Sequence, residues 1–158
     1  MKLKSVEALL KEKKIFEIVN PRLNQAPPEV SVARAIELMQ EKRSGYLVIA
    51  QDRKAVGLFT ETDVVQKILD RDVDGARPVG EFMTPNPPVL RMQDTVGEAI
   101  DKMVQHQFYY IPLVDEGGEL VNVLSVRSLI RFLAEFYPTE IYNLPPDPSQ
   151  VMSTEEGG

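Results

Sequence analysis

Two stretches of the chain carry apolar residues at helical spacing, and each is followed by two short apolar runs. In the first stretch, Val32, Ile36 and Met39 recur every three or four positions with charged residues between them, which predicts an amphipathic helix. The runs at 46–50 and 56–59 are separated by four polar residues, 51–54, and Ala55, and they predict a β-hairpin. This stretch is therefore expected to form a helix followed by two antiparallel strands.

The same pattern returns 64 positions later. Met39 corresponds to Met103, and the register holds at polar positions as well as apolar ones. One extra residue in the loop that contains Gly117 lengthens the offset to 65 from there on. A match kept over a fixed period indicates an internal duplication. The strands of the second hairpin are expected at 108–114 and 120–124.

Helix signals stand at matching places in the two copies. Ser31 and Thr95 each come directly before a helical pattern, where a hydroxyl side chain caps the first turn. A second helix is expected after each hairpin, carrying apolar residues at 64–69 in the first copy and at 129–133 in the second. Each copy is thus predicted to end on a helix.

A short first strand completes each copy. We expect it at Val89 and Leu90 in the second copy and at Val30 in the first, which gives the order β-α-β-β-α twice. A unit of about fifty residues buries too little surface to be stable alone, so the two copies should share a core. The predicted fold class is α/β (α+β), with two repeats packed as a pseudo-twofold pair.

The segments outside the repeats complete the predicted organisation. An amphipathic helix is expected at 5–16, and the prolines from Pro138 onward are expected to prevent a long helix and leave an irregular C-terminal tail. The predicted divisions are an N-terminal helix and lead-in (1–25), the first repeat (26–72), a linker with the second repeat (73–137) and a Pro-rich, partly disordered tail (138–158).

Composition narrows the classes of function. The 158 residues include 18 Lys and Arg against 24 Asp and Glu, a formal net charge of −6 that disfavours nucleic-acid binding. With no cysteine and one histidine, His106, the chain lacks the side chains for disulfides, thiol catalysis or a multi-histidine metal site. No apolar run approaches membrane-spanning length, and we expect a cytoplasmic protein. We expect no enzyme activity, no catalytic cofactor and no metal site.

The first hairpin ends in a recognisable motif. Residues 56–63, Val-Gly-Leu-Phe-Thr-Glu-Thr-Asp, resemble the Gly-h-h-Thr-x-x-Asp signature of the CBS domain, where h is an apolar residue. Residues 79–85 and 110–115 are similar to two further segments of that family, and the resemblance covers roughly residues 15–136. It implies a tandem CBS pair, or Bateman module, whose clefts bind AMP, ADP, ATP or S-adenosylmethionine. It also implies association into a homodimer.

The resemblance assigns roles to residues of the first repeat. Thr60 is expected to face the phosphate or the ribose, and Asp63 to accept hydrogen bonds from the ribose hydroxyls. Val48 and Val56 are expected to flank the base from the two strands. On spacing alone, Thr60 and Asp63 are also a plain helix cap with no ligand, so both interpretations stay open at this point.

The second repeat departs from the motif. Asn122 replaces the glycine and Ser128 replaces the aspartate, while Ser125 keeps the hydroxyl. A serine does not accept from two ribose hydroxyls as a carboxylate does, and Arg127 favours a phosphate instead. We therefore predict one principal nucleotide site on Thr60 and Asp63, with Ser125 and Arg127 contacting the phosphates from the other repeat.

These observations favour a regulatory binding module. The predicted function is to sense adenine nucleotides, and so the energy state of the cell, and to signal by a conformational change to an unidentified partner in trans. Neither a nucleic acid nor a membrane is expected among its partners. The alternative is a dimerisation scaffold whose ligand sites are degenerate, which the serine at position 128 favours.

Overall fold

The computed structural model describes residues 3–20 and 22–142, and it confirms two repeats of the predicted order. The N-terminal helix is α1 (Leu3–Glu12), followed by the 3-10 turn η1 (Ile15–Glu17). The first repeat contains β1 (Gln25–Ala26), α2 (Val32–Glu41), β2 (Tyr46–Gln51), β3 (Lys54–Thr60), α3 (Glu61–Asp63) and the π-helical η2 (Val64–Leu69). Next come η3 (Val79–Glu81) and β4 (Thr84–Pro85), then the second repeat with β5 (Leu90–Arg91), α4 (Val96–His106), β6 (Tyr110–Val114), β7 (Leu120–Ser125) and α5 (Val126–Tyr142).

The predicted helix caps form as expected. The Ser31 hydroxyl accepts a hydrogen bond from the Arg34 backbone N–H at 3.1 Å, and the Thr95 hydroxyl accepts from Glu98 at the same distance. Each bond satisfies one of the backbone donors that a helix start leaves unpaired. The caps therefore fix the beginnings of α2 and α4 at equivalent places.

The first strand of the first repeat lies earlier than predicted. Gln25 and Ala26 form β1, whereas Val30 lies in the turn before α2. Pro27 and Pro28 end the strand, because a proline donates no hydrogen bond to a neighbouring strand. Ala26 stands 64 positions before Leu90, so the duplication itself pointed to the correct strand.

Two small sheets carry the hairpins. The order is β1-β2-β3-β4 in one sheet and β5-β6-β7 in the other, with each hairpin antiparallel and each first strand parallel to its neighbour. A register shift follows Ile49 in the first hairpin and Leu113 in the second. The duplication therefore extends to this irregularity, because these residues also lie 64 positions apart.

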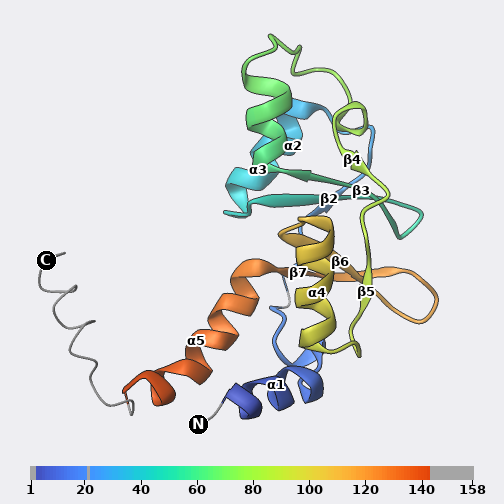
Figure 1. Cartoon of the computed structure of the whole chain (residues 1–158). Helices are drawn as coiled ribbons and strands as arrows, with labels where there is room; N and C mark the ends of the chain where they lie inside the picture. The colour runs from blue at the N-terminus through green and yellow to red at the C-terminus, as the bar shows by residue number, and fades with distance from the viewer. Residues whose placement is uncertain (1–2, 21, 143–158) are drawn as a thin grey trace, which may run out of the picture.

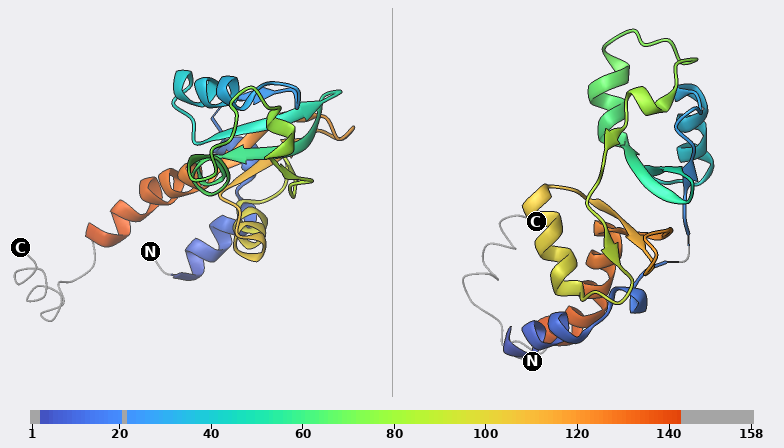
Figure 2. Two further views of the ribbon diagram at one scale, coloured as in Figure 1. Left: turned by 90° about the horizontal axis from the view of Figure 1, so that it is seen from above. Right: turned by 90° about the vertical axis from the view of Figure 1, so that its right-hand side faces the viewer.

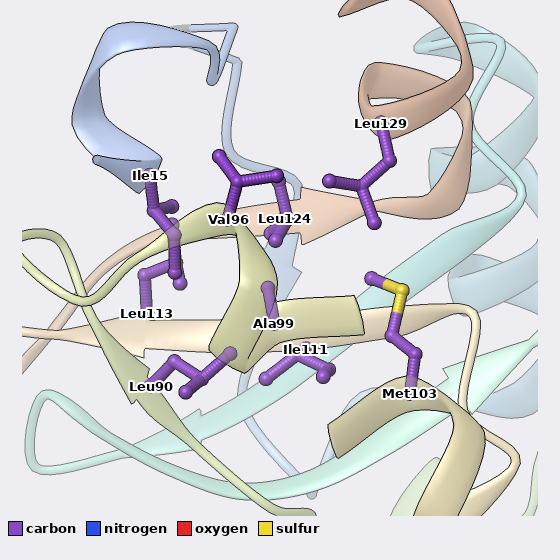
Figure 3. Packing of buried hydrophobic residues seen from close by; sticks show 9 residues of the cluster. All are labelled: Ile15, Leu90, Val96, Ala99, Met103, Ile111, Leu113, Leu124 and Leu129. Carbon is purple, nitrogen blue, oxygen red and sulfur yellow. The ribbon is translucent and has the colours of Figure 1, made fainter. Parts of the chain in front are cut away.

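Each repeat has its own core on the outer face of its sheet. Figure 3 shows nine buried side chains of the second repeat gathered between α4, the β6–β7 hairpin and the start of α5. The first repeat contains the counterparts of most of them, such as Met39 for Met103 and Ile49 for Leu113. A third cluster, of Val48, Leu58 and Val123, fills the space between the two sheets. The two repeats therefore lie one above the other with their sheets facing each other (Figure 1).

The lead-in segments of the two repeats are exchanged. Ile15, in η1 before the first repeat, is fully buried in the core of the second repeat. Val79, in η3 before the second repeat, is fully buried in the core of the first. Strand β4 then pairs with β3 of the first repeat before the chain reaches β5 (Figures 1 and 2). Each core is thus completed by the segment that precedes the other repeat.

Helix α5 is longer than the prolines predict. It continues through Pro138 to Tyr142 and points away from the body of the molecule (Figures 1 and 2). One proline removes one backbone donor and clashes with the carbonyl four residues earlier, which kinks a helix without necessarily ending it. The irregular tail predicted from 138 therefore does not begin there, and residues 143–158 lie outside the described part of the chain.

Candidate functional site

Thr60 and Asp63 form a capping box at the start of α3. The Thr60 side chain accepts from the Asp63 backbone N–H at 3.4 Å. In return, Asp63 Oδ2 accepts from the Thr60 backbone N–H at 2.9 Å and from the Thr60 hydroxyl at 3.3 Å. This reciprocal arrangement satisfies the start of the helix without any ligand.

The other oxygen of Asp63 is also engaged. Lys67 Nζ lies 3.0 Å from Asp63 Oδ1, one helical turn along, and donates to the Phe82 carbonyl at 2.8 Å. Asp63 is buried, with 7% of its surface exposed. Both carboxylate oxygens therefore already have partners within the first repeat.

The equivalent position of the second repeat has no carboxylate. The Ser125 hydroxyl accepts from the Ser128 backbone N–H at 3.1 Å, and the two hydroxyl oxygens lie 3.2 Å apart. Phe132 stands where the first repeat has Lys67. The start of α5 thus keeps the positive end of its helix dipole without a neighbouring acidic side chain, which favours an anion.

A cleft of about 880 Å³ opens between the two repeats. Ser125 and Arg127, the two residues for which we predict phosphate contacts, line it together with Ser128. Thr60 and Asp63 do not line it, because their side chains cap α3 within the first repeat. The structure therefore brings two of the six predicted residues to the cleft.

The two valines predicted to flank the base lie in different clusters. Val48 is fully buried between the sheets, whereas Val56 packs against the core of the first repeat. The irregular register after Ile49 separates their faces. The structure does not bring them together as two walls of one pocket.

Two tyrosines related by the duplication meet at the cleft. The rings of Tyr46 and Tyr110 lie 5.1 Å apart with an interplanar angle of 40°. The Tyr46 hydroxyl donates to the Arg22 carbonyl at 3.1 Å, and the Tyr110 hydroxyl donates to Glu61 Oε1 at 3.4 Å. Burial raises the pKa of both phenols, and the negative charge of Glu61 raises the pKa of Tyr110 further. Both phenols are therefore neutral donors at physiological pH.

Gly45 lets Glu61 and Tyr110 approach each other beside the cleft. A Cβ at position 45 would collide with the Tyr110 hydroxyl and lie 2.8 Å from Glu61 Oε1. The Glu61 backbone N–H also donates to the Gly45 carbonyl at 3.0 Å. Glu61 is thereby fixed at the cleft wall through its backbone, with its carboxylate next to a phenol of the other repeat.

The cleft is rich in positive charge, although the chain as a whole is acidic. Its described lining contains Arg22, Lys42, Arg43, Arg127 and Arg131, against a single carboxylate, that of Glu61. The ion pairs formed among described residues involve none of these five cations. Such a concentration of cations favours an anionic ligand.

Sequence reasoning missed several of these residues. Arg22, Lys42 and Arg43 belong to no motif, and Glu61 occupies a variable position of the signature. All four lie in the first repeat, and they line the cleft together with Arg127 only because the repeats pack together. Glu61 alone had a signal, because it directly follows the predicted cap Thr60. Arg53 is outside the cleft lining and lies on the exposed β2–β3 turn, 3.9 Å from Glu119.

A smaller cavity of about 410 Å³ lies between α1, η1 and α5. Ser128 and Arg131 line both this cavity and the main cleft. Within the part of the chain that the structure describes, no cluster of three or more His, Cys, Asp or Glu residues is arranged to hold a metal ion. Among those same residues, no helix is both long and apolar enough to cross a membrane.

Comparison with known protein families matches residues 15–70 and 79–135 to the CBS domain. The chain belongs to the CBS domain family. The two matched CBS domains are the two structural repeats, each beginning at the lead-in that packs on the other repeat.

Several known proteins are similar to this chain. An uncharacterised 17.7 kDa protein of Acidianus ambivalens is 30% identical over 78% of this chain and 75% of its own length. Arabinose 5-phosphate isomerase of Francisella tularensis is 23% identical over 80% of this chain, which spans only 36% of that enzyme. The crystal structure of CBSX2 in complex with AMP is 26% identical, with a TM-score of 0.67 over 78% of this chain and 98% of that one.

Proposed function

We propose that this CBS pair is a regulatory module that binds an adenine nucleotide in the cleft between its repeats. The observation that carries the proposal is the cationic cleft at the start of α5, where Ser125 and Arg127 stand beside a helix terminus free of carboxylates. Backbone donors, the helix dipole and a guanidinium together suit a phosphate group. The AMP complex of the similar protein CBSX2 supports an adenine nucleotide as the ligand.

In this proposal, Glu61 accepts hydrogen bonds from the ribose hydroxyls. It is the single carboxylate among the described residues lining the cleft, whereas both oxygens of Asp63 have partners inside the first repeat. The motif-based role of Thr60 and Asp63 as the ribose and phosphate contacts is the competing assignment. The two assignments predict opposite results for Glu61→Gln and Asp63→Asn.

The regulatory step follows from the position of the cleft. Its walls come from both repeats, with Glu61 on one side and Ser125 and Arg127 on the other. A ligand that bridges them favours the arrangement in which both sets of contacts form. We propose that a partner in trans, and a second copy of the chain in a homodimer, respond to this change. The module itself carries out no reaction in this scheme.

The first test is calorimetric titration with adenosine, AMP, ADP, ATP and S-adenosylmethionine. Arg127→Ala is expected to weaken the three phosphate-bearing nucleotides about tenfold, because it removes a charged hydrogen-bond donor, and to leave adenosine nearly unchanged. Glu61→Gln is expected to weaken adenosine as well. Arg71→Ala serves as the control, since Arg71 is exposed and lies outside the cleft lining.

Each other outcome has a definite meaning. Equal losses of adenosine and ATP with Arg127→Ala would remove the phosphate role of Arg127. A loss with Asp63→Asn and none with Glu61→Gln would return the ribose to the first-repeat motif.

Absence of binding by every compound would favour the alternative function, a dimerisation scaffold. The observation that favours this alternative is the ion pair between Lys67 and Asp63, because Asp63 is the carboxylate of the CBS signature and is already paired within the first repeat.

A further inference from the structure

Three cations of the first repeat stand at the cleft, apart from the residues at the start of α5. Arg22, Lys42 and Arg43 form what we call the first-repeat lip. Arg22 Nη2 donates to the Lys42 carbonyl at 3.0 Å, which ties the lead-in to the end of α2. The lip therefore faces Arg127 and Arg131 of the second repeat across a common cleft.

The fold does not require these charges. Cations at the end of a helix are favourable to its dipole, which is the ordinary explanation for Lys42 and Arg43. The matching positions of the second repeat, however, are His106 and Gln107. Arg43 and Gln107 have the same left-handed backbone conformation, with φ of 50° and 57°. The same turn thus forms in the second repeat without permanent cations at the positions of Lys42 and Arg43.

With the lip, the cleft has more positive charge than a monophosphate can neutralise. One phosphate at Ser125 and Arg127 brings at most two negative charges to a cleft whose described lining has five cations and one carboxylate. Each further phosphate adds about one negative charge. The β- and γ-phosphates of ADP and ATP can pair with the lip cations, which the single phosphate of AMP leaves unpaired. S-adenosylmethionine has no phosphate, and its single carboxylate is outweighed by its sulfonium and ammonium charges.

We propose that the first-repeat lip makes the cleft selective for adenosine di- and triphosphates over AMP and S-adenosylmethionine. The α-phosphate lies at Ser125 and Arg127, and the outer phosphates lie toward Lys42 and Arg43. The inference rests on the proposed function, since it needs an adenine nucleotide in this cleft.

The test compares ATP, ADP, AMP and adenosine by calorimetric titration without magnesium, at low and high salt. The wild-type chain is expected to bind ATP and ADP more tightly than AMP, and salt should weaken ATP the most. Lys42→Gln/Arg43→Gln is expected to weaken ATP roughly three- to thirtyfold and AMP less than twofold. Lys54→Gln/Arg71→Gln removes the same net charge from exposed residues outside the cleft lining and should change neither.

The results separate the lip from the proposed function. If AMP binds the wild-type chain as tightly as ATP, or if the lip variant weakens both equally, the lip has no selective role although nucleotide binding stands. If adenosine and all its phosphates fail to bind, the proposed function falls, and the inference falls with it. Circular dichroism and the thermal midpoint check that each variant is folded. We expect folded variants, because the substituted residues are exposed.

Discussion

Lys67 gives the first repeat a charge pair that the second repeat lacks. The motif spacing predicted that Thr60 and Asp63 would cap a helix, and that interpretation describes their hydrogen bonds. The same spacing does not reveal where a carboxylate points. The lysine four residues after Asp63 was a readable warning, because residues at that spacing lie side by side on a helix. Residue types in a motif thus predicted the local cap, but not access to the cleft.

Replacing Lys67 with methionine is expected to destabilise the protein. The substitution leaves the buried Asp63 carboxylate without its cation and the Phe82 carbonyl without a side-chain donor. We expect a loss of about 1–3 kcal/mol in the free energy of unfolding, below the range for a fully buried pair because a third of the Lys67 side chain is exposed. Urea unfolding measures the loss.

The control for this variant is Lys54→Met, which removes the same charge from the exposed first residue of β3. It is expected to change the free energy of unfolding by less than about 0.5 kcal/mol. Equal stabilities of the two variants would mean that the Lys67–Asp63 pair makes no net contribution.

At the level of elements, local signals were sufficient for most of the fold. Caps, helical spacing and turn residues predicted α2, α4 and both hairpins, because each depends on neighbours in the sequence. The two-residue strands β1 and β4 carry no comparable local signal, since they are strands only through pairing with β2 and β3, and the 64-residue period alone pointed to β1. The prediction that Pro138 and the later prolines prevent a long helix was wrong for α5, which continues to Tyr142.

Strand β3 needs a glycine where Met83, just before β4, packs directly against its backbone. Gly57 pairs with Pro85 of β4, and a Cβ at position 57 would collide with the Met83 side chain. We expect Gly57→Ala to lower the free energy of unfolding by about 1–3 kcal/mol, as overpacking does. Adding Met83→Ala should restore part of the loss, which a double-mutant cycle in urea measures.

Gly117→Ala is the matched control for the glycine variant. A Cβ there meets only Asp115 Oδ1, at 3.4 Å, so we expect almost no change in stability. Failure of Met83→Ala to relieve Gly57→Ala would show that the methionine is not the obstacle.

At the level of the whole molecule, the duplication predicted two packed repeats but not the exchange of their lead-ins. The pattern of one repeat gives no indication of whose core a preceding segment enters. The full lining of the cleft was beyond sequence reasoning for the same reason, because Glu61 and Lys42 come together with Arg127 only after the repeats have packed.

Because each lead-in packs in the core of the other repeat, we expect the two repeats to unfold together in a single cooperative transition. Ile15→Ala removes a fully buried side chain of the second core from a segment that precedes the first repeat. We expect it to lower the free energy of unfolding by about 2–5 kcal/mol and to speed hydrogen exchange in both cores alike. Phe16→Ala, at the exposed neighbouring position, should have little effect. If Ile15→Ala accelerated hydrogen exchange in the second repeat alone, the two repeats would not unfold as one unit.

The exchanged lead-ins make a single repeat complementary to a copy of itself. A lone repeat would have an unfilled place in its core and, on the same chain, a free segment with the apolar residue that fits another repeat's vacancy. Ile15 and Val79 occupy these places 64 positions apart, and the isolated bridges Lys14–Thr95 and Ser31–Pro78 repeat the same reciprocity. Two identical half-length chains would satisfy each other in the way a domain-swapped dimer does. The tandem chain joins those two partners covalently, and we therefore expect neither half to be stable as a separate monomer.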